Sequence, residues 1–158
     1  EIGQIEVRGP NVFKGYWKMP EKTKAELREN GFFITGDLGK IDEDGYVHIL
    51  GRDKDLIISG GYNIYPKELE EIIDDQAGVL ESAVIGVPHP DFGETPIAVI
   101  VSETEITPEL EVIESNLRKS LARYKHPKKL LWIDQLPRNT MGKVQKNMLR
   151  EEYKSLFS

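Results

Sequence analysis

The sequence predicts an α+β fold in two parts, a β-rich segment over residues 1–52 and a small domain of layered sheet and helices over residues 53–158. Three observations support this prediction. Apolar, β-branched runs have the length of strands, helical patterns open at proline, and a glycine followed by four charged residues interrupts two apolar runs at residues 51–55. The second part, at about 105 residues, is long enough to fold around its own core.

In the β-rich segment, residues 2–7 alternate imperfectly between apolar and polar and predict a strand. Pro20 lies in the expected first turn of a short helix that ends near Leu27, and Asn30-Gly31 is a strong turn signal. A brief strand that ends in Thr35-Gly36-Asp37 and a hairpin complete the segment, at residues 32–34, 38–41 and 46–50. The acidic turn of the hairpin, residues 42–45, lacks the twelve-residue ligand spacing of an EF-hand loop.

The second part has seven expected elements in the order strand, helix, strand, strand, helix, strand, helix. A tight loop, Ser59-Gly60-Gly61-Tyr62-Asn63, follows the first strand, and a helix opens at Thr107-Pro108-Glu109. The seven elements are expected at residues 56–58, 65–73, 79–87, 97–101, 107–121, 129–133 and 144–156. This alternation of apolar strands and amphipathic helices is typical of a small layered α+β domain.

The charge distribution excludes some functions and favours others. The formal net charge of −6 argues against general nucleic-acid binding. Residues 118–150, however, contain ten Lys or Arg residues and a single acid, Asp134. This basic end is suited to a phosphorylated small molecule, and the alternative is a solvated helix face and loop.

Cysteine and histidine give no sign of a metal site or a disulfide. The chain has no cysteine, and His48, His89 and His126 lack the spacing of metal ligands. No run approaches the roughly 20 apolar residues of a membrane span, and the acidic N-terminus does not resemble a signal peptide. We therefore expect a cytoplasmic protein without a membrane partner.

A short stretch near the C-terminus, residues 136–146, contains the candidate catalytic residue. Pro137 and Gly142 bracket a loop that is expected to hold Lys143 in an exposed, defined position. A lysine placed in this way is suited to a phosphate or to a developing negative charge. Taken alone, the same pattern also describes an ordinary solvated lysine in a polar turn.

Several stretches, taken together in their order and spacing, resemble one family. They are Ile2-Gly3-Gln4-Ile5-Glu6-Val7-Arg8-Gly9 with Gly15-Tyr16-Trp17, Thr35-Gly36-Asp37, Gly51-Arg52-Asp53-Lys54-Asp55, residues 59–70 and residues 137–143. They resemble the later signatures of the adenylate-forming superfamily of acyl-CoA synthetases, peptide-synthetase adenylation domains and luciferases. The amino-acid sequence of residues 9–17 and 136–145 is most similar to that of malonyl-CoA synthetases.

The resemblance implies a C-terminal fragment of an acyl-CoA synthetase. Residues 1–52 would be the distal β-rich end of the large N-terminal domain, and residues 53–158 would be the mobile C-terminal domain. The phosphate loop, the adenine pocket and the carboxylate pocket of the family would lie in the preceding sequence, which would also supply ligands for Mg²⁺. The fragment alone is therefore expected to be folded but inactive.

The resemblance assigns residues to the first step, in which ATP adenylates a carboxylate. Asp37 would accept hydrogen bonds from the ribose hydroxyls, and Arg52 would lie on the same nucleotide side. Lys143 would bridge the carboxylate substrate and the α-phosphate. The alternative for Asp37 is a turn acid that caps a strand, and the alternative for Arg52 is a surface ion pair with Asp53 or Asp55.

In the second step the thiol of CoA attacks the acyl-adenylate after the small domain has rotated. Lys54 falls at the family's hinge position, and Gly60 and Gly61 match a loop that lines the pantetheine channel. The Lys143 loop and this glycine loop would serve opposite faces of the domain. Basic residues with potential contacts to the CoA phosphates are Arg118, Lys119, Arg123, Lys125, Lys128 and Lys129.

The implied cofactors and partners are ATP, Mg²⁺, CoA, a small carboxylate and the N-terminal domain of the same protein. The family resemblance also implies a protein lysine acetyltransferase as a regulator that acts on Lys143. Two other functions remain open. One is an adenylation domain that loads a carrier protein, and the other is a non-catalytic module that binds a nucleotide or a protein.

Overall fold

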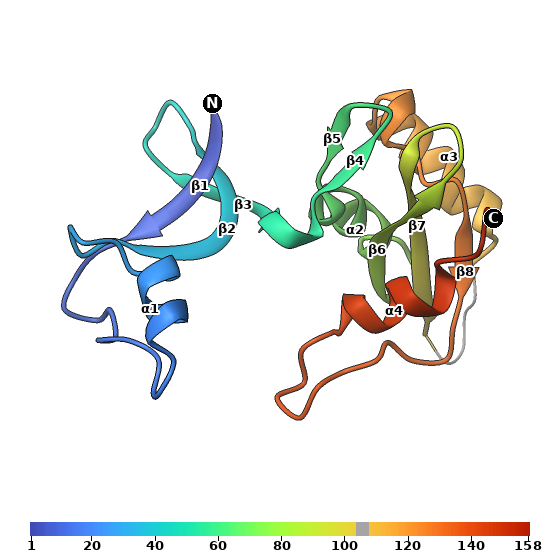
Figure 1. Cartoon of the computed structure of the whole chain (residues 1–158). Helices are drawn as coiled ribbons and strands as arrows, with labels where there is room; N and C mark the ends of the chain where they lie inside the picture. The colour runs from blue at the N-terminus through green and yellow to red at the C-terminus, as the bar shows by residue number, and fades with distance from the viewer. Residues whose placement is uncertain (104–107) are drawn as a thin grey trace. The chain divides into compact units, whose positions relative to one another are not determined.

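The computed structural model describes residues 1–103 and 108–158, and these form two compact units, Glu1–Lys54 and Asp55–Ser158 (Figure 1). We refer to them as unit 1 and unit 2. The division falls two residues beyond the boundary expected after residue 52, within the charged interruption of residues 51–55.

Unit 1 is a three-stranded antiparallel sheet with one short helix. The strands follow the order β1-β2-β3, and the helix α1 begins at a proline, as the sequence predicts. Their bounds are β1 (Ile2–Val7), α1 (Pro20–Glu26), β2 (Phe33–Ile41) and β3 (Val47–Arg52).

The expectation that a first strand ends at Thr35-Gly36-Asp37 is wrong, because β2 continues through these residues. The hydroxyl of Thr35 donates to the backbone carbonyl of Ile5 at 2.8 Å and accepts from the backbone N–H of Asp37 at 3.0 Å. Gly36 supplies a positive φ of 75° at this point. The irregular backbone is therefore satisfied within the sheet instead of ending it.

Unit 2 contains a five-stranded sheet in which β5, β4, β7 and β6 are neighbours in that order and β8 pairs with β7 in parallel. The strands are β4 (Ile57–Ser59), β5 (Tyr62–Ile64), β6 (Val79–His89), β7 (Gly93–Ser102) and β8 (Leu130–Trp132). Two loop predictions are corrected. Tyr62 and Asn63, expected in the loop at residues 59–63, belong to β5. The segment left between the predicted strands at residues 79–87 and 97–101 is largely strand, since His89 pairs with Gly93.

Three helices cover this sheet, α2 (Pro66–Asp74), α3 (Leu110–Ser120) and α4 (Lys146–Tyr153) (Figure 1). The last helix is shorter at both ends than the predicted range of residues 144–156, and before its start Val144 pairs with Arg138 in an isolated bridge. The expected start of the middle helix at Thr107 lies outside the described residues.

The core of unit 2 has two faces, as a sheet with helices on both sides requires. Alternate residues of β7 point in opposite directions: Ile100 packs with α2 and α3, whereas Val99 packs with α4. The helices contribute fully buried side chains to these two clusters, namely Leu69, Ile73, Ile113, Leu117 and Leu149. The predicted layered α+β fold is confirmed.

Candidate functional site

The Lys143 loop, residues 137–145, connects β8 to α4 and is closed by its own backbone. The N–H of Asn139 donates to the carbonyl of Lys143 at 3.0 Å, and the N–H of Gln145 donates to the carbonyl of Pro137 at 2.8 Å. The side-chain oxygen of Asn139 accepts from the N–H groups of Met141 and Lys143 at 3.0 and 2.9 Å. These contacts give the loop a fixed turn geometry around an exposed lysine.

Two other cations of this region are paired, whereas Lys143 has no ion-pair partner in the part of the chain that the structure describes. Arg138 forms an ion pair with Glu81 of β6, and Lys146 lies 2.5 Å from Glu70 of α2. Over residues 1–103 and 108–158, the Lys143 ammonium has no carboxylate within ion-pair distance. The loop therefore presents one uncompensated positive charge, the arrangement expected of a group that meets an anionic ligand.

Asp37 and Arg52 lie together in unit 1, directly opposite each other on β2 and β3. The Nε atom of Arg52 is 3.0 Å from Oδ1 of Asp37, and its Nη1 donates to the carbonyl of Thr35 at 2.9 Å. The guanidinium is half exposed and the carboxylate is half-buried. The pair thus presents an oriented carboxylate and a fork of donors at the C-terminal end of β3.

Lys54 occupies the junction of the two units. It lies in a single 3-10 turn, Asp53–Asp55, and its side chain is exposed. On the far side of the junction, Asp55 forms an ion pair with Arg150 of α4 at 2.5 Å, so the first residue of unit 2 is anchored to its own domain. The surface ion pair considered for Arg52, with Asp53 or Asp55, is replaced by the pair with Asp37.

Gly60 and Gly61 form the two-residue turn between β4 and β5, with φ angles of 56° and 83°. Both angles are in the left-handed region, which glycine adopts at little energetic cost. A β-carbon on Gly60 would lie 3.3 Å from the ring of Phe92, while one on Gly61 would meet open space. In Figure 1 this turn and the Lys143 loop lie at opposite ends of unit 2.

Beside this turn is a pocket of about 480 Å³, which we call the Gly60 pocket. The rings of Tyr62 and Tyr124 stack there with centroids 4.7 Å apart, and the ammonium of Lys128 lies 4.8 Å from the ring centre of Phe92. The hydroxyl of Thr95 is fully buried and has no hydrogen-bond partner in the described structure. The lining residues are Ser59, Gly60, Tyr62, Phe92, Thr95, Arg123, Tyr124, His126 and Lys128.

The sequence indicates only part of this pocket. Arg123 and Lys128 belong to the predicted basic set, but Arg118 and Lys125 are engaged elsewhere, with Glu114 and Glu68. The aromatic residues and His126 were not identified as site residues. Tyr124 and His126 alternate with basic residues, which is only a weak indication of a binding site. Nothing in the local sequence indicates that Tyr124 stacks on Tyr62.

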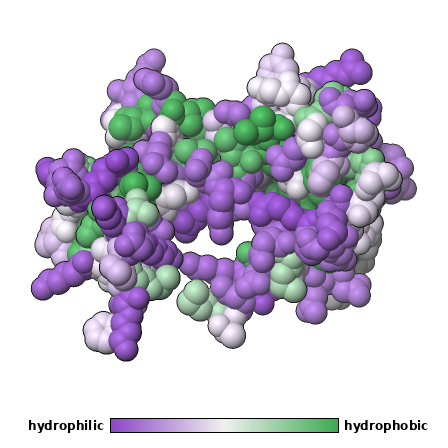
Figure 2. Space-filling model, viewed as in Figure 1, coloured by the Kyte–Doolittle hydropathy of each residue, from purple (hydrophilic) through white to green (hydrophobic). Residues whose placement is uncertain are grey.

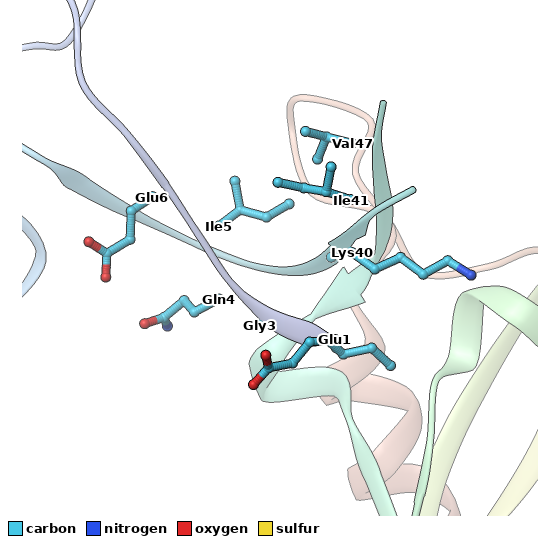
Figure 3. Close-up of a pocket in the computed structure, with 10 residues that line it drawn as sticks. Glu1, Gly3, Gln4, Ile5, Glu6, Lys40, Ile41 and Val47 are labelled. Carbon is cyan, nitrogen blue, oxygen red and sulfur yellow. The ribbon is translucent and has the colours of Figure 1, made fainter. Parts of the chain in front are cut away.

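A further hollow of about 410 Å³ lies on unit 1. Ile41 and Val47 pair at the end of the β2–β3 hairpin beside it, and both are more than half exposed (Figure 3). Hydrophobic residues gather over this part of unit 1 in the space-filling view (Figure 2). Such an exposed apolar face is typical of a surface that is covered by another part of a protein.

The described residues contain no group of three or more His, Cys, Asp or Glu side chains arranged for a metal ion. Outside residues 104–107, the chain also has no helix with the length and apolar character needed to cross a bilayer.

Comparison with known proteins places this fold and these motifs among adenylate-forming enzymes, and unit 2 has the architecture of their small C-terminal domain. The family described as AMP-binding enzyme C-terminal domain matches residues 68–143, which lie in unit 2.

Curated relatives and solved structures agree with this assignment. The chain is 43% identical over 96% of its length to the long-chain-fatty-acid–CoA ligase FadD13 of Mycobacterium tuberculosis, of which it covers 30%. It is 42% identical over 99% of its length to the 2-succinylbenzoate–CoA ligase of Geobacillus kaustophilus, of which it covers 31%. The crystal structure of ATP-bound MatB from Rhodopseudomonas palustris is similar over the whole chain, with 63% identity, a TM-score of 0.90 and 31% of that chain covered. The chain thus spans about a third of the length of these relatives.

Proposed function

We propose that the protein carrying this chain is an ATP-dependent acyl-CoA synthetase. In the first step a carboxylate oxygen attacks the α-phosphorus of ATP, forming an acyl-adenylate and releasing pyrophosphate. In the second step the thiol of CoA attacks the acyl carbon, forming the thioester. AMP leaves, and the proton of the thiol passes to solvent. Adenylation is required because a free carboxylate has a poor leaving group. The names of the curated relatives, which are CoA ligases, support this proposal.

The single observation that carries the proposal is the Lys143 loop. A fixed turn presents one exposed ammonium whose charge no described carboxylate compensates, while its neighbours Arg138 and Lys146 are paired. A cation held in this way stabilises the charge that develops when a carboxylate attacks the α-phosphate. Asp37 and Arg52 are assigned to the ribose of the nucleotide, and the Asp37 carboxylate accepts hydrogen bonds from its two hydroxyl groups.

The Gly60 pocket and its turn are assigned to the second step. Gly60 and Gly61 let the pantetheine arm pass close to the backbone, since neither has a side chain. The stacked rings of Tyr62 and Tyr124 offer an apolar surface, and Arg123 and Lys128 offer charge to the phosphates of CoA. The position of the Lys143 loop at the other end of unit 2 supports the use of the two surfaces in alternate steps (Figure 1).

In this proposal unit 1 is the distal end of a large N-terminal domain and unit 2 is the mobile C-terminal domain, as predicted for residues 1–52 and 53–158. Lys54 is the hinge residue whose torsions absorb the rotation, and its exposed position between the units supports this role. The exposed apolar face of unit 1 is suited to packing against the rest of that large domain. Mg²⁺ accompanies ATP, and its ligands are assigned to the large domain.

The substrate that we propose is malonate or a related short acid. Two observations support this narrower proposal. The sequences of residues 9–17 and 136–145 resemble malonyl-CoA synthetases, and the chain is 63% identical to the malonyl-CoA synthetase MatB. The curated relatives act on other acids by name, including a long-chain fatty acid and 2-succinylbenzoate. The acid pocket itself is assigned to the large domain, so this chain does not contain the residues that select the acid.

The proposal is tested with the full-length protein by pyrophosphate release across a panel of carboxylates. We expect release that depends on ATP and on a short dicarboxylate, followed by thioester formation when CoA is added. Thioester formation on a carrier protein instead of CoA would favour the carrier-loading alternative. The absence of pyrophosphate release with every acid, together with retained ATP binding, would favour the non-catalytic module.

Regulation and location form a further part of the proposal. The exposure of Lys143 makes its amine accessible to a protein lysine acetyltransferase, and acetylation removes the charge on which adenylation depends. We assign the enzyme to the cytoplasm, where ATP and CoA are available to it.

A further inference from the structure

The Lys143 loop is fastened to the rest of unit 2 by ion pairs on both sides of the lysine. Arg138 lies five residues before Lys143 and pairs with Glu81 on β6. Lys146 lies three residues after it and pairs with Glu70 on α2. The loop is therefore tied at both ends to the central sheet and to the helix that covers it.

The carboxylate of Glu70 is itself held in place. Glu70 Oε1 accepts from the backbone N–H of Val84 at 2.7 Å and from Lys146 at 2.5 Å, so one oxygen joins α2, β6 and α4. The Glu70–Lys146 pair is largely withdrawn from solvent, with side-chain exposures of 17% and 18%. Such a pair is screened much less by salt than an exposed one.

Arg138 makes a second contact that ties it directly to the residue before the lysine. Its Nη1 donates to the carbonyl of Gly142 at 2.6 Å, while its Nη2 pairs with Glu81. The planar fork of the guanidinium thus joins the Gly142–Lys143 peptide to β6. Lysine offers a single ammonium and lacks this geometry.

We propose that Arg138 and Lys146, held by Glu81 and Glu70, are positioning residues for Lys143. The four residues form a clamp that fixes the Lys143 backbone and compensates the neighbouring cations. Of Arg138, Lys143 and Lys146, Lys143 alone has no carboxylate partner among the described residues. The inference rests on the adenylation role proposed for Lys143. It extends that role by naming the side chains that hold the lysine in place, and a displacement of about 1 Å at such a group lowers a rate by about a hundredfold.

The test compares Arg138→Ala, Glu81→Gln and the double variant in the full-length enzyme. We expect each single variant to lower kcat of adenylation by about 10- to 100-fold, with little change in KM for ATP. The double variant should be no slower than the slower single variant, because both changes open the same contact. Arg138→Lys should recover only part of the lost rate, since one of the two contacts remains.

Arg28→Ala is the matched control. Arg28 pairs with Glu6 in unit 1 with side-chain exposures of 50% and 25%, close to the 43% and 27% of Arg138 and Glu81. We expect this control to keep wild-type adenylation. Conversion of a preformed acyl-adenylate to the thioester should also be unaffected in all clamp variants.

Amide hydrogen exchange supplies a readout that does not depend on catalysis. In Arg138→Ala the Lys143 N–H, which donates to the Asn139 side chain, should exchange at least about tenfold faster than in the wild type. Unchanged exchange, or adenylation within twofold of wild type while Lys143→Ala is inactive, would overturn the clamp. If Lys143→Ala itself kept full adenylation, the proposed function of the lysine would fail, and the exchange rates alone would decide whether the clamp holds the loop.

Discussion

Arg52 and Asp37 face each other across β2 and β3, with Nε 3.0 Å from Oδ1, and the same guanidinium also donates to the carbonyl of Thr35. The arginine thereby orients the carboxylate, which lies half-buried on the central strand of the sheet. A preoriented acceptor is what recognition of a ribose diol requires.

Replacing this carboxylate should weaken nucleotide binding. In the full-length enzyme we expect Asp37→Ala to raise KM for ATP by about 10- to 100-fold, the loss of about 1.5 to 3 kcal/mol from hydrogen bonds to a charged group. Steady-state pyrophosphate release at varied ATP measures the effect. Asp44→Ala, in the exposed hairpin turn, is the control and should leave KM unchanged.

Loss of charge at Lys143 should affect one half-reaction only. We expect acetylation of Lys143, or Lys143→Ala, to lower adenylation by about two to four orders of magnitude, or about 3 to 5 kcal/mol. Thioester formation from a preformed acyl-adenylate should change little. Separate assays of the two half-reactions on modified and unmodified enzyme decide the matter, and a defect confined to the thiol step would contradict the assignment.

Restricting the junction between the units should produce the opposite result. Lys54→Pro fixes φ at the proposed hinge, so we expect near-normal adenylation and a thiol step slower by about one to two orders of magnitude. Lys54→Ala keeps the backbone free and serves as the control. Equal losses in both half-reactions would argue against a hinge at this residue.

If the Gly60 pocket binds CoA, a substitution in it should weaken CoA binding without affecting adenylation. Removing the exposed ammonium over Phe92 by Lys128→Ala should raise KM for CoA by about three- to tenfold and leave adenylation unchanged. Because the contact is exposed, the difference between variant and wild type should shrink at high salt. Lys67→Ala, on α2 and paired with Glu71, is the control and should show neither effect.

Asp74 should make the stability of unit 2 depend on pH. Partial removal from water raises the pKa of this carboxyl, Ser82 beside it acts in the opposite direction, and the nearby Glu70 and Glu81 raise the pKa further. A raised carboxyl pKa means that the folded state binds more protons than the unfolded state, so stability falls as the pH rises through that pKa.

We therefore expect Asp74→Asn to increase the free energy of unfolding at pH 7 and to have little effect near pH 4, around the ordinary pKa of an aspartate. Denaturant unfolding at several pH values between these limits measures the difference. An Asp74→Asn variant that is less stable than wild type at pH 7 would contradict the prediction.

Local patterns in the sequence determined the helix starts, the longer core strands and the Lys143 loop, whereas the family resemblance supplied the other candidate residues. Pro20 and Pro66 mark helix starts, the apolar runs of residues 79–87 and 97–101 lie within β6 and β7, and Pro137 and Gly142 bracket the loop that exposes Lys143. These features depend on backbone preferences and on periodicity, which act over a few residues and can therefore be read directly from the chain.

Only the tertiary structure decided which distant side chains meet. Arg138 and Glu81 are 57 residues apart, and Lys146 and Glu70 are 76 apart, yet these contacts fix the Lys143 loop. Likewise, β5 was not predicted, because Tyr62 and Asn63 follow Gly60-Gly61 in a sequence typical of a tight loop, and only the pairing with β4 defines them as strand. Long-range contacts such as these depend on how helices pack on the sheet and on strand register, neither of which any local stretch of the sequence specifies.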